Sequence, residues 1–157
     1  MISYTLLNYH SKLWNSGLMS IYEYAYKPEL DDLTILNDFF TESNYSIKDE
    51  SALGRPFVID NLSANDLKQY SKKELLKILH DFSRPDGWSE PKYIKAEIEY
   101  IENHMNHFRT DKFYFISTDF FDISSSKIEL ESLAYVYYYL FFWFQNNEMH
   151  VCQMCLD

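Results

Sequence analysis

Residues 135–157 read YVYYYLFFWFQNNEMHVCQMCLD, and eight of the first ten are aromatic. The apolar run from Leu133 to Phe144 has twelve residues, which is short of the roughly 20 that a helix needs to cross a bilayer. No basic cluster flanks the run to hold it at an anionic membrane surface, and Glu129 and Glu131 lie just upstream. The run therefore predicts an element inside a fold.

The dipeptide Asn146-Asn147 predicts a hairpin turn, because asparagine tolerates the positive φ that the favoured two-residue turn requires. We expect antiparallel strands over 134–145 and 148–156. The two-residue loop sets the register, pairing Trp143 with His150, Phe141 with Cys152 and Tyr139 with Met154 on one face, and Phe144 with Met149 and Phe142 with Val151 on the other. A helix across 128–145 is the alternative, since periodicity alone does not separate a short buried helix from a buried strand.

The first strand of this hairpin is apolar on both faces, so it should be central and covered twice. Helices form one cover. The second cover is either the N-terminal segment or another protein chain. Tyr135, Tyr137 and Tyr139 give one face many tyrosines, which suit an ordinary core and also an interface. A homodimer through this face is the interface alternative.

Upstream patterns predict helices over 28–42, 63–70, 72–83 and 90–108. The first begins with a proline and three acids, and Leu33, Leu36 and Phe40 would form its inner face. Ser71 and Glu74 match a capping box before the third helix. The last helix carries an apolar stripe at spacings of four and three, formed by Ile94, Ile98, Ile101, Met105 and Phe108.

Strands are predicted over 113–117, which reads FYFIS, and over 57–59. Residues 1–27 follow neither a helical nor a strand period. No repeat or Pro/Gly-rich linker divides the chain. We therefore predict one α+β domain over 1–157, with N-terminal and central helices packed on a mainly antiparallel sheet that ends in a C-terminal hairpin.

The formal net charge is -10, and it is concentrated at the two ends of the chain. Lys and Arg minus Asp and Glu give 4 - 9 = -5 for residues 1–60, 9 - 9 = 0 for 61–112 and 1 - 6 = -5 for 113–157. Such a surface repels nucleic acid and anionic membranes and attracts a basic protein. The first residues lack an export signal and the chain has only two cysteines, so a cytoplasmic location is expected.

Motifs of catalysis and ligand binding are weak. Cys152 and Cys155 have the C-x-x-C spacing, but one pair is half of a structural zinc site, and buried cysteines fit better. His104 and His107 lie three apart, and a solvated helix end fits them better than a metal. No nucleophile motif or glycine-rich phosphate loop occurs. We predict no catalytic residue, no cofactor and no metal.

The stretches YFIST and YYYLFFWFQNNEMHVCQMCLD, within a short acidic chain with loosely marked helices, resemble immunity proteins of bacterial contact-dependent and other polymorphic toxin systems. The resemblance covers mainly residues 113–157 and lies in general style. It implies an inhibitor, without enzymatic activity, that binds one cognate toxin C-terminal domain. Nuclease toxins tend to be basic because they bind phosphate backbones, which an acidic inhibitor would complement.

The contact patch of such an inhibitor should combine carboxylates with aromatic anchors. The candidate toxin-binding residues are Asp31, Asp38 and Glu42 on the first helix, with Asp49 and Glu50 in the following loop. Two alternatives stay open: a small cytosolic enzyme or metal-binding protein of unrecognised type, and a homo-oligomeric interaction module.

Overall fold

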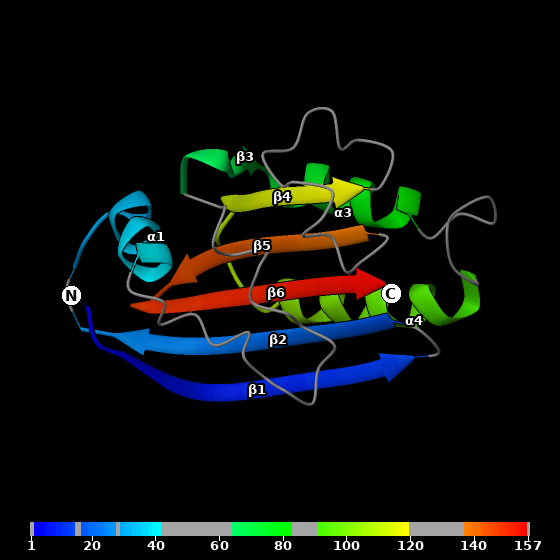
Figure 1. The fold of residues 1–157 in the computed structure, drawn as a ribbon, viewed down its shortest axis with the longest axis horizontal. Helices are drawn as coiled ribbons and strands as arrows, with labels where there is room; N and C mark the ends of the chain where they lie inside the picture. The colour runs from blue at the N-terminus through cyan, green and yellow to red at the C-terminus, as the bar shows by residue number, and fades with distance from the viewer. Residues whose placement is uncertain are drawn as a thin grey trace.

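The structure is a computed structural model that describes residues 2–14, 17–27, 29–41, 64–82, 91–119 and 137–156. Its strands are β1 (Tyr4–Trp14), β2 (Gly17–Tyr26), β3 (Lys68–Tyr70), β4 (Phe113–Asp119), β5 (Tyr137–Gln145) and β6 (Glu148–Leu156). Its helices are α1 (Asp32–Thr41), the 3₁₀ turn η1 (Ala64–Asp66), α3 (Lys72–Phe82) and α4 (Pro91–Met105). The strands form one antiparallel sheet in the order β1-β2-β6-β5-β4-β3 (Figure 1). The α+β prediction is confirmed.

The C-terminal hairpin has the predicted turn and the predicted register. Asn146 and Asn147 have φ of 54° and 58°, as the favoured two-residue turn requires. Trp143 pairs with His150 and Phe142 pairs with Val151. The hairpin lies inside the sheet, where β6 is bordered by β2 and β5 is bordered by β4. Residues 134–136, the predicted start of the first strand, lie outside the described residues.

The left-handed backbone of this turn leads to a testable prediction. Replacing Asn147 with glycine should leave the free energy of unfolding unchanged or raise it, because glycine adopts positive φ without a steric penalty. Replacing it with valine should lower the free energy of unfolding by about 1–2 kcal/mol, since a β-branched side chain disfavours this region. Urea unfolding of both variants measures the difference. Equal stability of the two variants would contradict the prediction.

Residues 4–14 and 17–26, which show no clear period, form the paired strands β1 and β2 at one edge of the sheet. The sequence of β2 shows no alternation of apolar and polar residues, because both faces of the strand are buried. Met19 and Ile21 point to one face, while Tyr22, Tyr24 and Tyr26 point to the other. The N-terminal segment, predicted as one possible cover of the sheet, thus mainly widens it.

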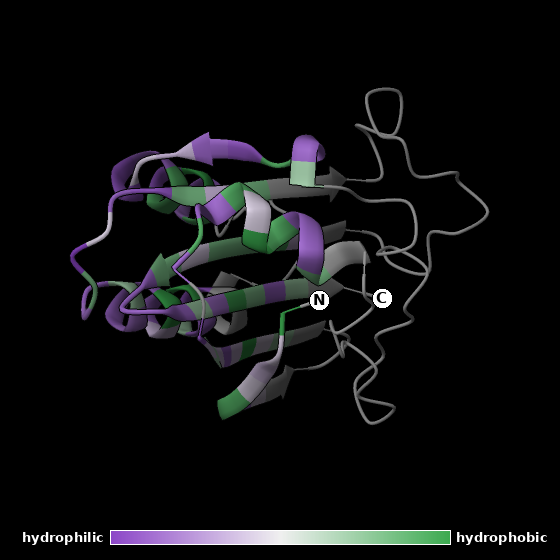
Figure 2. Ribbon diagram, turned by 90° about the vertical axis from the view of Figure 1, so that its left-hand side faces the viewer, coloured by the Kyte–Doolittle hydropathy of each residue, from purple (hydrophilic) through white to green (hydrophobic). Residues whose placement is uncertain are grey.

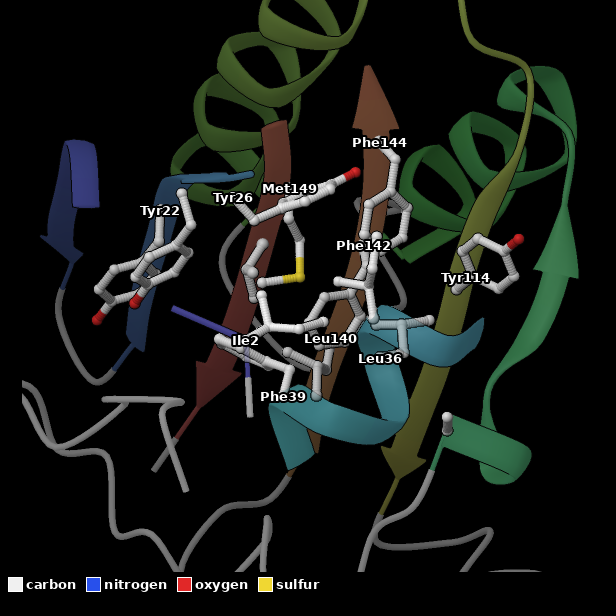
Figure 3. Close-up of a cluster of buried hydrophobic side chains, with 14 residues drawn as sticks. Ile2, Tyr22, Tyr26, Leu36, Phe39, Tyr114, Leu140, Phe142, Phe144 and Met149 are labelled. Carbon is white, nitrogen blue, oxygen red and sulfur yellow. The ribbon is translucent and has the colours of Figure 1, made fainter. Parts of the chain in front are cut away.

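The second cover is α1, which packs on the face formed by the tyrosines of β2 and by alternate residues of the C-terminal hairpin (Figure 3). Three residues of α1, Ile35, Leu36 and Phe39, are fully buried there. They meet Leu140, Phe142, Phe144, Met149 and Val151 from β5 and β6, together with Ile2 and Ala64. The apolar residues of α1 therefore bury this face of β5 and β6.

The inner face of α1 differs from the predicted one. Leu36 is buried as expected, but Leu33 is 46% exposed and the side chain of Phe40 lies outside the described residues. The helix begins at Asp32 and not near residue 28, with Asp31 as its N-cap. Asp32 and Asp38 each accept a hydrogen bond from a tyrosine of the sheet, which fixes the rotation of α1.

Helices α3 and α4 cover the opposite face (Figure 1). The fully buried side chains of this face are Met19, Leu75, Leu79, Ile98, Ile101, Met105, Phe113, Phe141, Trp143, Cys152 and Met154. The stripe predicted for the last helix is confirmed at Ile98, Ile101 and Met105. Phe108 follows the helix and is partly buried, and the side chain of Ile94 lies outside the described residues. In Figure 2 the helices carry hydrophobic and hydrophilic residues side by side, as amphipathic helices on a sheet do.

The capping box before α3 is confirmed. The backbone N–H of Ser71 donates to Glu74 Oε2 at 2.8 Å, and the N–H of Glu74 donates to Ser71 Oγ at 3.1 Å. The helix predicted over 63–70 is wrong, because η1 occupies 64–66 and β3 occupies 68–70. Tyr70 stacks edge-on against Phe115 of β4, so pairing with the sheet edge outweighs local preference. The strand predicted over 57–59 lies outside the described residues.

Candidate functional site

Asp31 is exposed at the start of α1, as a binding carboxylate should be. Its Oδ1 accepts the backbone N–H of Thr34 at 3.1 Å and its Oδ2 accepts the Thr34 hydroxyl at 2.6 Å. These bonds, above all the one from the hydroxyl, lower the pKa of Asp31, so the carboxyl is ionised at neutral pH. Asp31 therefore serves as the N-cap of α1 and also presents a negative charge to solvent.

The carboxylate of Asp38 is engaged in hydrogen bonds within the fold. Its two carboxylate oxygens accept the backbone N–H of Ile2 at 3.2 and 3.1 Å, and Oδ2 also accepts the Tyr4 hydroxyl at 3.0 Å. The residue is half-buried between α1 and the start of β1. Its charge is thus engaged in holding two segments of the chain together. The other three predicted toxin-binding residues, Glu42, Asp49 and Glu50, lie outside the described residues.

Two exposed leucines, three residues apart, flank Asp31 at the start of α1. Leu30 is 44% exposed and Leu33 is 46% exposed, and the exposed Glu29 precedes them. We call residues 29–33 the α1 entry surface. It combines carboxylates with apolar anchors, as expected of a contact patch, although the anchors are leucines and not aromatic residues.

A different cluster lies on the opposite side of the sheet, under α4. The donor atoms of Glu23, His104 and His150 all lie within 4.8 Å of one another. Glu23 Oε1 is 3.2 Å from His104 Nε2 and 3.7 Å from His150 Nδ1. We call these three residues the histidine cluster. A carboxylate and two imidazoles at such distances offer the donor set that proteins use for zinc-like cations.

The sheet itself builds two corners of the histidine cluster. Glu23 on β2 is directly opposite His150 on β6, and His150 is directly opposite Trp143 on β5. Directly opposite residues on neighbouring strands share one face with Cβ atoms roughly 5 Å apart, so register alone places them together. The last turn of α4 adds His104 from above. The signal for this cluster was a histidine inside an apolar strand, which the sequence alone did not connect to Glu23.

His150 is buried in an aromatic enclosure. Its side chain is 1% exposed, and its ring stacks on Trp143 with centroids 5.1 Å apart and planes at 10°. Phe108 covers the ring at a centroid distance of 4.3 Å. Burial, aided by repulsion from His104, lowers the pKa of His150 to about 4, so its imidazole is neutral at neutral pH. Burial also lowers the pKa of His104.

The two histidines that the sequence placed together are separated in the structure. His104 belongs to the histidine cluster and points toward Glu23. His107 is exposed, and its Nδ1 lies 2.6 Å from the carbonyl oxygen of Asn103. Cys152 is fully buried among apolar residues, which raises the pKa of its thiol well above the ordinary value. Its expected role as a buried small hydrophobe agrees with this position, and the side chain of Cys155 lies outside the described residues.

Comparisons of the chain with known protein families, with curated proteins and with solved structures found no match. The three helices α1, α3 and α4 are too short or too polar to cross a bilayer, and the same holds for every helical segment in the described ranges.

Proposed function

We propose that this protein is an immunity protein that binds and neutralises the C-terminal domain of a cognate bacterial toxin, with a basic nuclease as the expected target. The observation that supports this most directly is the α1 entry surface, where Leu30 and Leu33 are exposed beside the carboxylates of Glu29 and Asp31. Exposed leucines supply burial energy, and ionised carboxylates attract a cationic partner.

The net charge of -10 supports the same partner class. A strongly acidic protein attracts a cationic domain over long distances and raises its association rate, and salt weakens this attraction. The inhibitor would occupy the surface with which the toxin binds phosphate backbones, and thereby block its substrate. This mode of action needs no catalytic residue in the inhibitor.

The experiment is co-expression with the C-terminal domain encoded by the gene immediately upstream, followed by co-purification and a growth assay. We expect a stoichiometric complex, protection of the cells and an association rate that falls steeply between low and high salt. Absence of both complex and protection would overturn the proposal. A complex with a salt-independent association rate would contradict the electrostatic part.

The binding surface is tested by two substitutions and a matched control. Asp31→Asn keeps an N-cap residue while it removes the charge, so it should slow association without unfolding α1. Leu33→Ala should weaken binding and raise the dissociation constant by about tenfold. Glu99→Gln removes an exposed charge from α4 on the other side of the sheet and should leave affinity nearly unchanged. Equal effects of all three variants would place the contact elsewhere.

A further inference from the structure

We propose that Glu23, His104 and His150 form a binding site for a divalent metal ion of the zinc class. This site goes beyond inhibition of a toxin and is independent of it, because the histidine cluster lies under α4 while the α1 entry surface belongs to the opposite face. Its ligands come from β2, α4 and β6, which are far apart in the chain.

The two distances from the Glu23 carboxylate fit one central ion, and all three donor atoms lie within 4.8 Å of one another. Ligands bound about 2.0–2.1 Å from a tetrahedral Zn²⁺ lie roughly 3.3 Å from one another. The measured distances from Glu23 Oε1, 3.2 Å to His104 Nε2 and 3.7 Å to His150 Nδ1, are close to this value. Two imidazoles and one carboxylate leave a fourth position, which a water molecule fills in zinc sites with three protein ligands.

The buried imidazole nitrogens supply a second, independent observation. Nε2 of His104 and both ring nitrogens of His150 are buried, and none of them makes a hydrogen bond of good geometry within the described parts of the chain. Buried polar atoms are nearly always satisfied, so His104 Nε2 and His150 Nδ1, which both lie within 4 Å of Glu23 Oε1, indicate a missing ligand.

The surroundings suit a metal site. Nε2 of His150 lies 3.6 Å from Glu148 Oε2, so a carboxylate is placed to orient the ring when Nδ1 binds the ion. Trp143 and Phe108 provide the apolar shell that limits access of water. The side chains of Glu23 and His104 are 18% and 21% exposed, so solvent reaches these two ligands.

The test is titration of the full chain, first treated with a chelator, with Zn²⁺ and with Co²⁺. We expect one equivalent to bind with a dissociation constant on the order of micromolar or tighter and to raise the unfolding temperature. The visible spectrum of the Co²⁺ form should show a tetrahedral site with nitrogen and oxygen ligands. Lack of stoichiometric binding, a preference for Mg²⁺ or Ca²⁺, or a thiolate charge-transfer band from the cysteines would overturn the proposal.

Substitutions assign the ligands. Glu23→Gln keeps the shape of the side chain and removes the anionic ligand, and His104→Gln changes a partly exposed residue. Each should weaken Zn²⁺ binding by at least about 100-fold. His107→Gln alters an exposed histidine in the turn that follows α4 and should leave binding unchanged. Circular dichroism of the metal-free variants shows whether each one folds. Folded Glu23→Gln and His104→Gln variants that bind Zn²⁺ as wild type does would overturn the assignment.

Discussion

Replacing Trp143 with alanine is expected to lower the free energy of unfolding by about 3–5 kcal/mol, the largest effect of any single substitution considered for this protein. The side chain is fully buried in the central strand β5. It stacks on Phe141 and His150, with centroids 5.8 and 5.1 Å away, and contacts Phe113 from β4. Alanine would leave a cavity that these flat rings, fixed by sheet pairing, fill only in part.

The measurement is urea unfolding followed by far-UV circular dichroism, because the substitution removes a tryptophan fluorophore. Trp143→Phe should have a much smaller effect, since it keeps an aromatic ring and removes an indole N–H that is buried without a hydrogen bond among the described residues. Leu33→Ala serves as the exposed control and should change stability by less than about 0.5 kcal/mol. A loss below about 1 kcal/mol in Trp143→Ala would show that this face is loosely packed.

Local signals in the sequence were sufficient to predict the turn and the helix start that neighbouring residues determine. Asn146-Asn147 predicted the turn and, through it, the full register of the C-terminal hairpin. Ser71 and Glu74 predicted the start of α3. Segments whose structure depends on distant partners were not predictable in this way. The strand β3 has only three residues and exists because it pairs with β4. The strand β2 was also missed, because it is buried on both faces and shows no alternation of apolar and polar residues.

The candidate site shows the same division between local and distant information. Exposure of Asp31 follows from its position before a helix, whereas the role of Asp38 depends on Ile2 and Tyr4, more than 30 residues away. The pairing of Glu23 with His150 spans nearly the whole chain and follows from the order and register of the strands. No spacing rule in the sequence connects these two residues. His104 was noticed through its neighbour His107, but its spatial partners are on the sheet.

Replacing Asp38 with alanine is expected to lower the free energy of unfolding by about 2–4 kcal/mol. The substitution removes an acceptor of the Ile2 N–H and of the Tyr4 hydroxyl, and hydrogen bonds to a charged group contribute about 1.5–3 kcal/mol each. Asp38→Asn retains one side-chain oxygen and should lose less. Loss of toxin binding by an Asp38 variant would therefore reflect a displaced α1 as much as a missing charge, so Asp31→Asn is the better test of the binding surface.

The pH dependence of stability distinguishes this hydrogen-bonded role of Asp38 from a purely exposed charge. Burial, together with the hydrogen bond to Asp38, raises the pKa of Tyr4 above its ordinary value near 10. The folded state then holds this proton more tightly than the unfolded chain does, so the stabilisation is complete below about pH 10 and is lost as the pH rises through the raised pKa. Tyr4→Phe should make the decline in unfolding free energy above about pH 10 less steep. Part of the decline should remain, because Tyr114 donates to Asp32 and its pKa is raised in the same way. An alkaline profile identical to that of wild type would mean that the Tyr4 hydroxyl does not donate to Asp38 in solution.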